Sequence, residues 1–126
     1  MLRALSLALS LAFSAPHVSA DAFEDAENAY ERGDFDTAAK AFRKLAEQGD
    51  VVAQYNLGFM YEYGTGVLQN YIMAHMWLNL ASANGAEKVV GELRDELAAQ
   101  MTAEDISKAQ AMARECMDSG YKNCGD

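Results

Sequence analysis

The chain has 126 residues, with 19 acidic and ten basic residues, a formal charge of −9 and two cysteines. Such an acidic surface repels the phosphate groups of nucleic acids and of anionic lipids, so neither is an expected partner. The length fits a single domain with one small core.

Residues 1–20 have the features of a secretory signal peptide. Arg3 supplies a basic start, an apolar stretch follows, and small residues precede the expected cleavage between Ala20 and Asp21. Because the apolar stretch is too short to span a bilayer, we expect no membrane span in the mature chain. Residues 21–126 then carry nine basic and 19 acidic residues, a net charge of −10, and are expected to be periplasmic or secreted.

The mature chain predicts helix along most of its length. It contains no proline, and residues that favour helices fill the intervals between its glycines. No segment alternates polar and apolar residues as a strand does. Asp34, Asp50 and Asn70 can cap helix starts, and glycines follow the expected helix ends. We therefore predict an all-α fold with six helices, over residues 22–32, 35–48, 51–63, 71–84, 87–100 and 103–118.

Two segments of the chain repeat each other. Residues 26–33, AENAYERG, match residues 57–64, LGFMYEYG, at an offset of 31. After the glycine the offset becomes 36, so that the next two residues align with Asn70 and Tyr71, and TGVLQ is an insertion in the second copy. A single helical hairpin cannot bury its apolar face alone, so the repeat predicts stacked hairpins.

Residues 49–85 resemble the Sel-one-like repeat (SLR), a relative of the tetratricopeptide repeat in which a loop carrying G-x-G-V joins two antiparallel helices. The sequence departs from the family pattern at Leu68 and Asn70, where proline and aspartate are usual. The structural positions of the repeat that match are Ala53, Leu57, Gly58, Tyr61, Gly64, Gly66, Val67, Ala74, Trp77, Ala81 and Gly85.

The resemblance implies a short α-solenoid, a right-handed stack of antiparallel helical hairpins. Residues 21–48 would form the first hairpin, residues 49–85 the complete repeat, and residues 86–126 a helical cap. Proteins with this repeat are adaptors and assembly scaffolds, and some bacterial members are exported. The resemblance therefore implies an exported bacterial protein that binds a protein or peptide partner and catalyses no reaction.

Several repeat positions have a role that the residues alone predict. Gly58 lies in the middle of a helix, where glycine costs about 1 kcal/mol relative to alanine, which predicts a close helix crossing. Tyr61 and Trp77 are expected to be core anchors, because aromatic side chains at helical spacing usually pack. Ala74 and Ala81 lie on either side of Trp77 and leave room for the facing helix.

The sequence provides few groups for catalysis. His75 is the only histidine of the mature chain, and no metal cluster or catalytic set is predicted around it. Gly64 and Gly66 follow a predicted helix instead of a strand, so they do not form a dinucleotide-binding loop, and we expect no cofactor. The open alternative is an enzyme, or an enzyme accessory, that acts on cell-envelope substrates through acidic residues.

The helix over residues 51–63 has a second stripe beside its core-facing side chains. This stripe can pack on the first hairpin, which is the preferred interpretation, or remain exposed and bind a partner. A homodimer formed through the stripe is a further alternative. The stripe comprises Tyr55, Phe59, Glu62 and Tyr63.

The last two predicted helices each have one apolar face to bury. In the first of them Val89, Leu93 and Leu97 are aligned. Cys116 and Cys124 are expected to form a disulfide in an oxidising compartment, because their spacing is not that of a redox or metal pair. This bond would pin the carboxyl-terminal tail.

Overall fold

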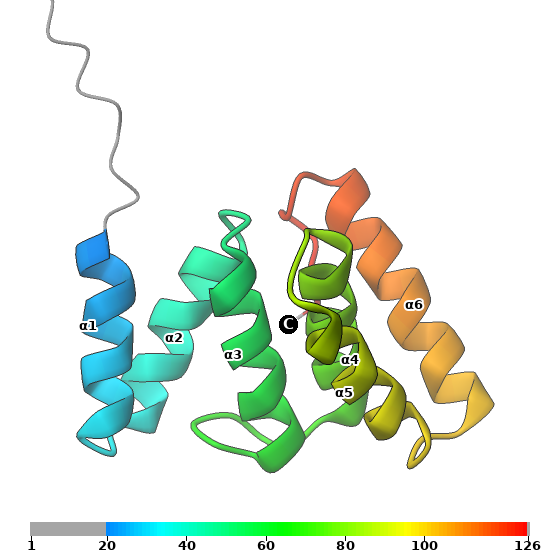
Figure 1. Cartoon of the computed structure of the whole chain (residues 1–126), viewed down its shortest axis with the longest axis horizontal. Coiled ribbons are helices and arrows are strands. Elements are labelled where there is room, and N and C mark those ends of the chain that lie inside the picture. Colours follow the sequence, from blue (N-terminus) through cyan, green and yellow to red (C-terminus); the bar gives the residue numbers. More distant parts are fainter. Residues whose placement is uncertain (1–19, 126) are drawn as a thin grey trace, which may run out of the picture.

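The computed structural model describes residues 20–125, which form six α-helices and contain no strand (Figure 1). The all-α prediction is therefore confirmed, and each helix lies where the sequence predicts it, to within a few residues at its ends. The predicted signal peptide lies outside the described residues except for Ala20. The helices are α1 (Ala20–Glu31), α2 (Phe35–Ala46), α3 (Val51–Tyr63), α4 (Tyr71–Ala83), α5 (Lys88–Ala98) and α6 (Ala103–Asp118).

Side-chain caps fix the starts of three helices. The side chain of Asp50 accepts a hydrogen bond from the Ala53 amide at 2.8 Å, and that of Asn70 accepts one from the Met73 amide at 3.1 Å. The hydroxyl of Thr102 caps α6 in the same way. Asp34 lies at the N-cap position of α2, as predicted, but its ψ angle of 68° departs from the extended backbone of the other caps and its side chain makes no cap bond.

The helices pack as a row of hairpins. The pair α1 and α2 and the pair α3 and α4 each pack together, α2 packs on α3 and joins the two pairs, and α4 also packs on α5 and α6 (Figure 1). Helix α4 therefore lies at the centre and is apolar on most of its surface. Its buried residues are Met73, Ala74, His75, Met76, Trp77, Leu78, Leu80 and Ala81.

The connection between α3 and α4 contacts the first hairpin. Gly64 and Gly66 have φ angles of 67° and 71°, which glycine adopts readily. A Cβ atom built at Gly66 would lie 2.6 Å from the carbonyl carbon of Phe35, at the start of α2. Val67 is half-buried against the core. The inserted TGVLQ segment thus closes its own hairpin and also packs on the preceding one.

The carboxyl-terminal tail returns from α6 to α2. A disulfide joins Cys116 to Cys124, and the hydroxyl of Tyr121 accepts a hydrogen bond of 2.7 Å from the Asn84 side chain. The guanidinium of Arg43, on α2, donates to the carbonyl oxygen of Gly125. The chain accordingly ends beside α2 and α4, near the middle of the row of helices in Figure 1, so the tail connects the last helix with the first hairpin.

Helix α5 differs from its predicted orientation. Val90 and Leu97 are buried, whereas Val89 is 48% exposed and Leu93 is half-buried. The expected alignment of Val89, Leu93 and Leu97 is therefore wrong at its first residue. The reason is that α5 has only α4 as a substantial packing partner, so a narrow face of the helix is buried. Among residues 20–125, no helix has both the length and the apolar character needed to cross a membrane.

Candidate binding site

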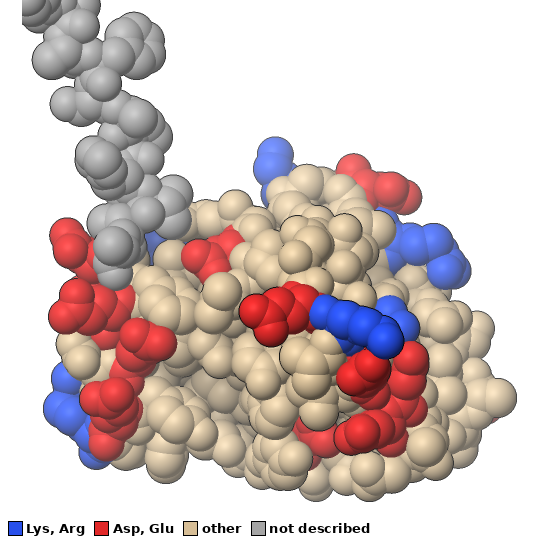
Figure 2. Space-filling view, viewed as in Figure 1, with Lys and Arg blue, Asp and Glu red and all other residues tan. Residues whose placement is uncertain are grey.

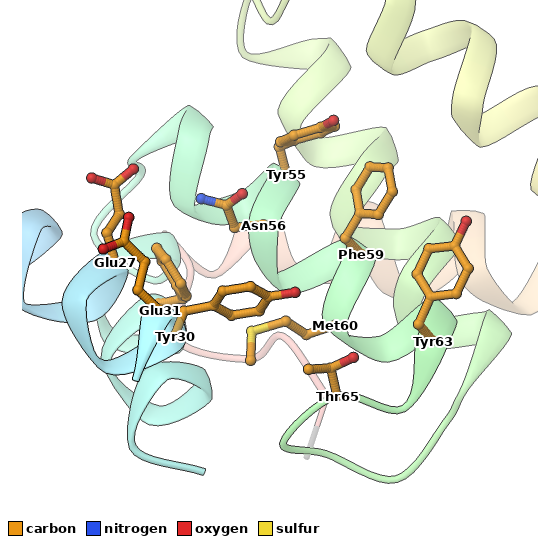
Figure 3. A pocket seen from close by; sticks show the side chains of 10 residues that line it. Glu27, Tyr30, Glu31, Tyr55, Asn56, Phe59, Met60, Tyr63 and Thr65 are labelled. Carbon is orange, nitrogen blue, oxygen red and sulfur yellow. The ribbon is translucent and has the colours of Figure 1, made fainter. Parts of the chain in front are cut away.

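A groove of about 350 Å³ lies between α1 and α3. It forms because both helices pack on α2, which leaves the space above α2 unfilled. Phe42 of α2 lies at its base, where the ring packs edge-on against Phe23 of α1 with a centroid distance of 5.7 Å. The groove is lined by Glu27, Tyr30, Glu31, Phe42, Tyr55, Asn56, Phe59, Met60, Tyr63 and Thr65 (Figure 3).

Three aromatic residues, Tyr55, Phe59 and Tyr63, form a continuous row along α3, which we call the aromatic ridge (Figure 3). The rings of Tyr55 and Phe59 meet edge to face with a centroid distance of 4.8 Å, and those of Phe59 and Tyr63 stack with a centroid distance of 5.7 Å. The first two residues are half-buried, whereas Tyr63 is 66% exposed. The predicted stripe is therefore partly buried, and its outer part remains accessible.

The opposite wall of the groove belongs to α1. Glu27 and Glu31 follow each other by one helical turn, and both are exposed. Neither carboxylate has an ion pair or hydrogen bond with another described residue. Beside them, Tyr30 reaches from α1 toward Met60 of α3 (Figure 3). This wall thus combines two unpaired negative charges with one aromatic ring.

Glu62, the fourth residue of the predicted stripe, does not line the groove. It lies on the side of α3 that faces α5, where burial, together with the negative charge of Glu96, raises the pKa of its carboxyl. The aromatic ridge therefore has carboxylates on both sides. Figure 2 shows acidic side chains gathered over α1, acidic and basic side chains side by side over α5, and a largely uncharged strip between the two helices.

The sequence alone did not identify the α1 wall of the site. The acidic residues near Glu27 have an ordinary explanation as favourable charges near a helix start. The signal that was available is the repeat itself, because Tyr30 and Glu31 align with Tyr61 and Glu62 of the second copy. Their different role follows from position, since no hairpin precedes α1 within the described residues 20–125.

His75 lies apart from the groove. It is 3% exposed within α4, and its Nδ1 atom has no hydrogen-bond partner among the described residues. Burial is the main cause that lowers its pKa; the positive charge of Arg94 acts in the same direction, and Asp95 opposes both. Within residues 20–125, no three histidine, cysteine or acidic side chains are grouped so that they could hold a metal ion.

The groove also lacks the carboxylate arrangement that glycoside hydrolysis needs. That chemistry requires two acids on opposite sides of the substrate. Glu27 and Glu31 are the acidic residues that line the groove in the described structure, and both come from α1. The arrangement can bind a ligand by its charge and its rings, and it presents no facing acid pair.

Comparison with protein families assigns the central part of the chain. Residues 51–85 match the model of the Sel1 repeat. This Sel1 repeat consists of α3, the connecting loop and α4, and it starts two residues inside the predicted limits of residues 49–85. Comparisons with curated proteins and with solved structures give no significant match.

The residues that match the Sel1 repeat lie either at helix ends and in the loop or in the core. Gly64 and Gly85 lie at exposed helix ends and have positive φ angles, and Gly66 and Val67 are half-buried in the loop. The remaining positions are buried between α3 and its neighbours, and they are Ala53, Leu57, Gly58, Tyr61, Ala74, Trp77 and Ala81. The Sel1 repeat thus builds the core, while the groove is formed where it meets the first hairpin.

Proposed function

We propose that the protein binds a segment of another protein in the groove between α1 and α3, as an adaptor or scaffold that catalyses no reaction itself. The observation that carries this proposal is the partly exposed aromatic ridge on the Sel1 repeat, since repeats of this kind generally mediate protein–protein interaction. Because the three rings already contact one another, their side chains lose little conformational entropy when a partner covers them.

The size of the groove supports a peptide segment as the bound part of the partner. A volume of about 350 Å³ is at the lower end of ligand pockets. It has room for a few side chains, whereas the surface of a folded domain would need a broad and flatter patch. A protruding loop or an unstructured tail of the partner fits this space.

We further propose that residues 21–126 act as one SLR domain outside the cytoplasm, in the periplasm of a bacterium or after secretion. The signal-like pattern of residues 1–20 supports export. The disulfide between Cys116 and Cys124 supports it independently, because such bonds persist in oxidising compartments. Fractionation of the producing cells tests this location: the protein would be found, without residues 1–20, in the envelope or the medium.

Site-specific photocrosslinking in the native cells tests the binding function. A photoreactive residue in place of Tyr63 should capture one discrete partner, because this side chain lies at the open edge of the groove. The matched control replaces Lys108, which is exposed on α6 away from the groove. Capture of the same proteins from both positions, or of none, would contradict binding in the groove.

A further inference from the structure

The charged residues that line the groove are of one sign. Among the described residues that line it, two are acidic and none is basic. Glu62 and Glu96 add negative charge on the far side of the aromatic ridge. A partner segment with acidic residues would therefore be repelled, and one with basic residues would be attracted, from several ångströms away.

The carboxylates of Glu27 and Glu31 are placed to receive a cation. Because neither is paired within the described structure, a lysine or arginine that enters the groove does not have to displace an existing ion pair. Hydrogen bonds from a charged donor to a carboxylate are about twice as strong as those between neutral groups. The half-buried side chain of Asn56 has no hydrogen-bond partner among the described residues and provides a further acceptor.

The apolar surface of the groove suits the stem of a basic side chain. Long basic side chains place their methylene groups on apolar surface while the charged end stays near polar groups. Tyr30 and Met60 provide this surface between the α1 carboxylates and α3 (Figure 3). The ring of Tyr30 can also attract the cation through its π face.

The aromatic ridge sets the length of the segment. Tyr55 and Tyr63 are eight helical steps apart, which corresponds to roughly 12 Å at the rise of an α-helix, and Phe59 lies midway. An extended peptide covers this distance with about four residues. Apolar side chains adjacent to the basic residue would lie on the ridge.

We propose that the groove recognises a short extended segment of a partner protein in which a lysine or arginine is followed or preceded by apolar residues. The basic side chain pairs with Glu27 and Glu31, and the apolar residues cover the aromatic ridge. This inference rests on the proposed function and specifies the partner chemistry of the same groove.

Selection from random ten-residue peptides displayed on phage tests the proposal with the purified, oxidised protein. Peptides that bind the native protein but not a Tyr63→Ser variant should be enriched in lysine or arginine beside apolar residues. If peptides that need Tyr63 for binding lack a basic residue, the proposed recognition of lysine or arginine is wrong, while the proposed function stands. If the selection gives no groove-dependent binder, both proposals fail.

Two synthetic peptides separate the α1 carboxylates from the aromatic ridge. The first is the selected peptide with its basic residue, and the second has glutamine in place of that residue. Glu27→Gln combined with Glu31→Gln should weaken the basic peptide about three- to tenfold and change the glutamine peptide less than about twofold. The matched control, Glu24→Gln combined with Asp25→Asn, changes the charge of α1 equally but alters no groove residue.

Fluorescence anisotropy measures these affinities, and circular dichroism verifies that each variant is folded. The proposal would be overturned if the double variant at Glu27 and Glu31 and the control double variant at Glu24 and Asp25 weakened binding of the basic peptide equally. The attraction would then be a general effect of the acidic surface. Tyr63→Ser should weaken both peptides alike, since the ridge contacts the apolar residues that they share.

Discussion

Gly58 allows α3 and α4 to approach closely. A Cβ atom at this position would lie 3.0 Å from Cγ of Leu78 and 3.3 Å from the carbonyl oxygen of Ala74. A Gly58→Leu variant should therefore lose about 1 to 3 kcal/mol of unfolding free energy through overpacking. Urea denaturation measures the loss. Val52→Leu, on the exposed side of the same helix, is the control and should change stability by less than about 0.5 kcal/mol. An unchanged urea midpoint for Gly58→Leu would show that the crossing is loose.

Gly66 combines a left-handed backbone with a close contact, and Gly33 isolates the first of these effects. Both have positive φ angles, but a Cβ at Gly33 would meet no atom within 4 Å. Gly33→Ala should thus cost about 1 to 2 kcal/mol from backbone conformation alone. Gly66→Ala should cost distinctly more, because its Cβ would overlap the backbone of Phe35. Equal losses of thermal stability in the two variants would contradict packing of the loop on α2.

The Glu62 carboxyl on α3, which is influenced by Glu96 on α5, makes the stability of the fold depend on pH. Burial, and to a lesser degree Glu96, raises the pKa of Glu62 above its ordinary value of 4.5. The folded protein then holds this proton more tightly than the unfolded chain does, so stability falls as pH rises from 4.5 through the folded-state pKa. Glu62→Gln should accordingly raise the urea midpoint at pH 7 and have little effect well below pH 4.5.

A Glu96→Gln variant is the comparison for Glu62→Gln. It removes only the smaller cause of the shift, so it should raise the midpoint at pH 7 less than Glu62→Gln does. If neither variant stabilises the protein at pH 7, the two carboxylates do not oppose each other across α3 and α5.

The carboxyl-terminal tail is held at its end by two contacts. The disulfide ties Cys124 back to Cys116 of α6, and Arg43 holds Gly125, the last described residue, while also donating to the Tyr61 hydroxyl at 3.1 Å. Closing a loop of this length is worth about 2 to 3 kcal/mol. Reduction should lower the unfolding free energy by about this amount and speed amide hydrogen exchange in the tail.

The double variant Cys116→Ala with Cys124→Ala controls for other effects of the reductant, which should not change its stability further. The oxidised protein should also have an intact mass two hydrogens below that of the reduced form. Alkylation of two free thiols in protein taken from the producing cells would contradict a bridge in vivo.

At the scale of the whole molecule, the sequence predicted what local signals control. The helices and most of their ends follow from glycines and caps such as Asp50 and Asn70, and the repeat positions Leu57 and Trp77 indicated the core. Asp34 shows the limit of such signals. Its residue type and position suit a cap, but it directly follows the turn at Gly33, and its side chain makes no cap bond.

The groove could not be predicted in the same way, because it depends on how two hairpins meet. The spacing of Tyr55, Phe59 and Tyr63 indicated a stripe on α3, yet spacing along one helix does not say what lies opposite it. Glu27 and Glu31 became part of the site only because α2 holds α1 beside α3. For the same reason Val90 is buried in α5 where Val89 was expected.

The distribution of charge bears on whether two copies of the chain associate. A stable protein dimer buries about 1,200 to 2,000 Å² in total, more than a groove suited to a peptide segment provides. Association through the aromatic ridge would also bring the acidic side chains over α1 of two molecules closer together (Figure 2). We therefore expect light scattering to give the mass of one chain over a hundredfold range of concentration at low salt. A mass that rises toward twice this value, and returns to that of one chain in Tyr63→Ser, would show instead that the ridge is a homodimer interface.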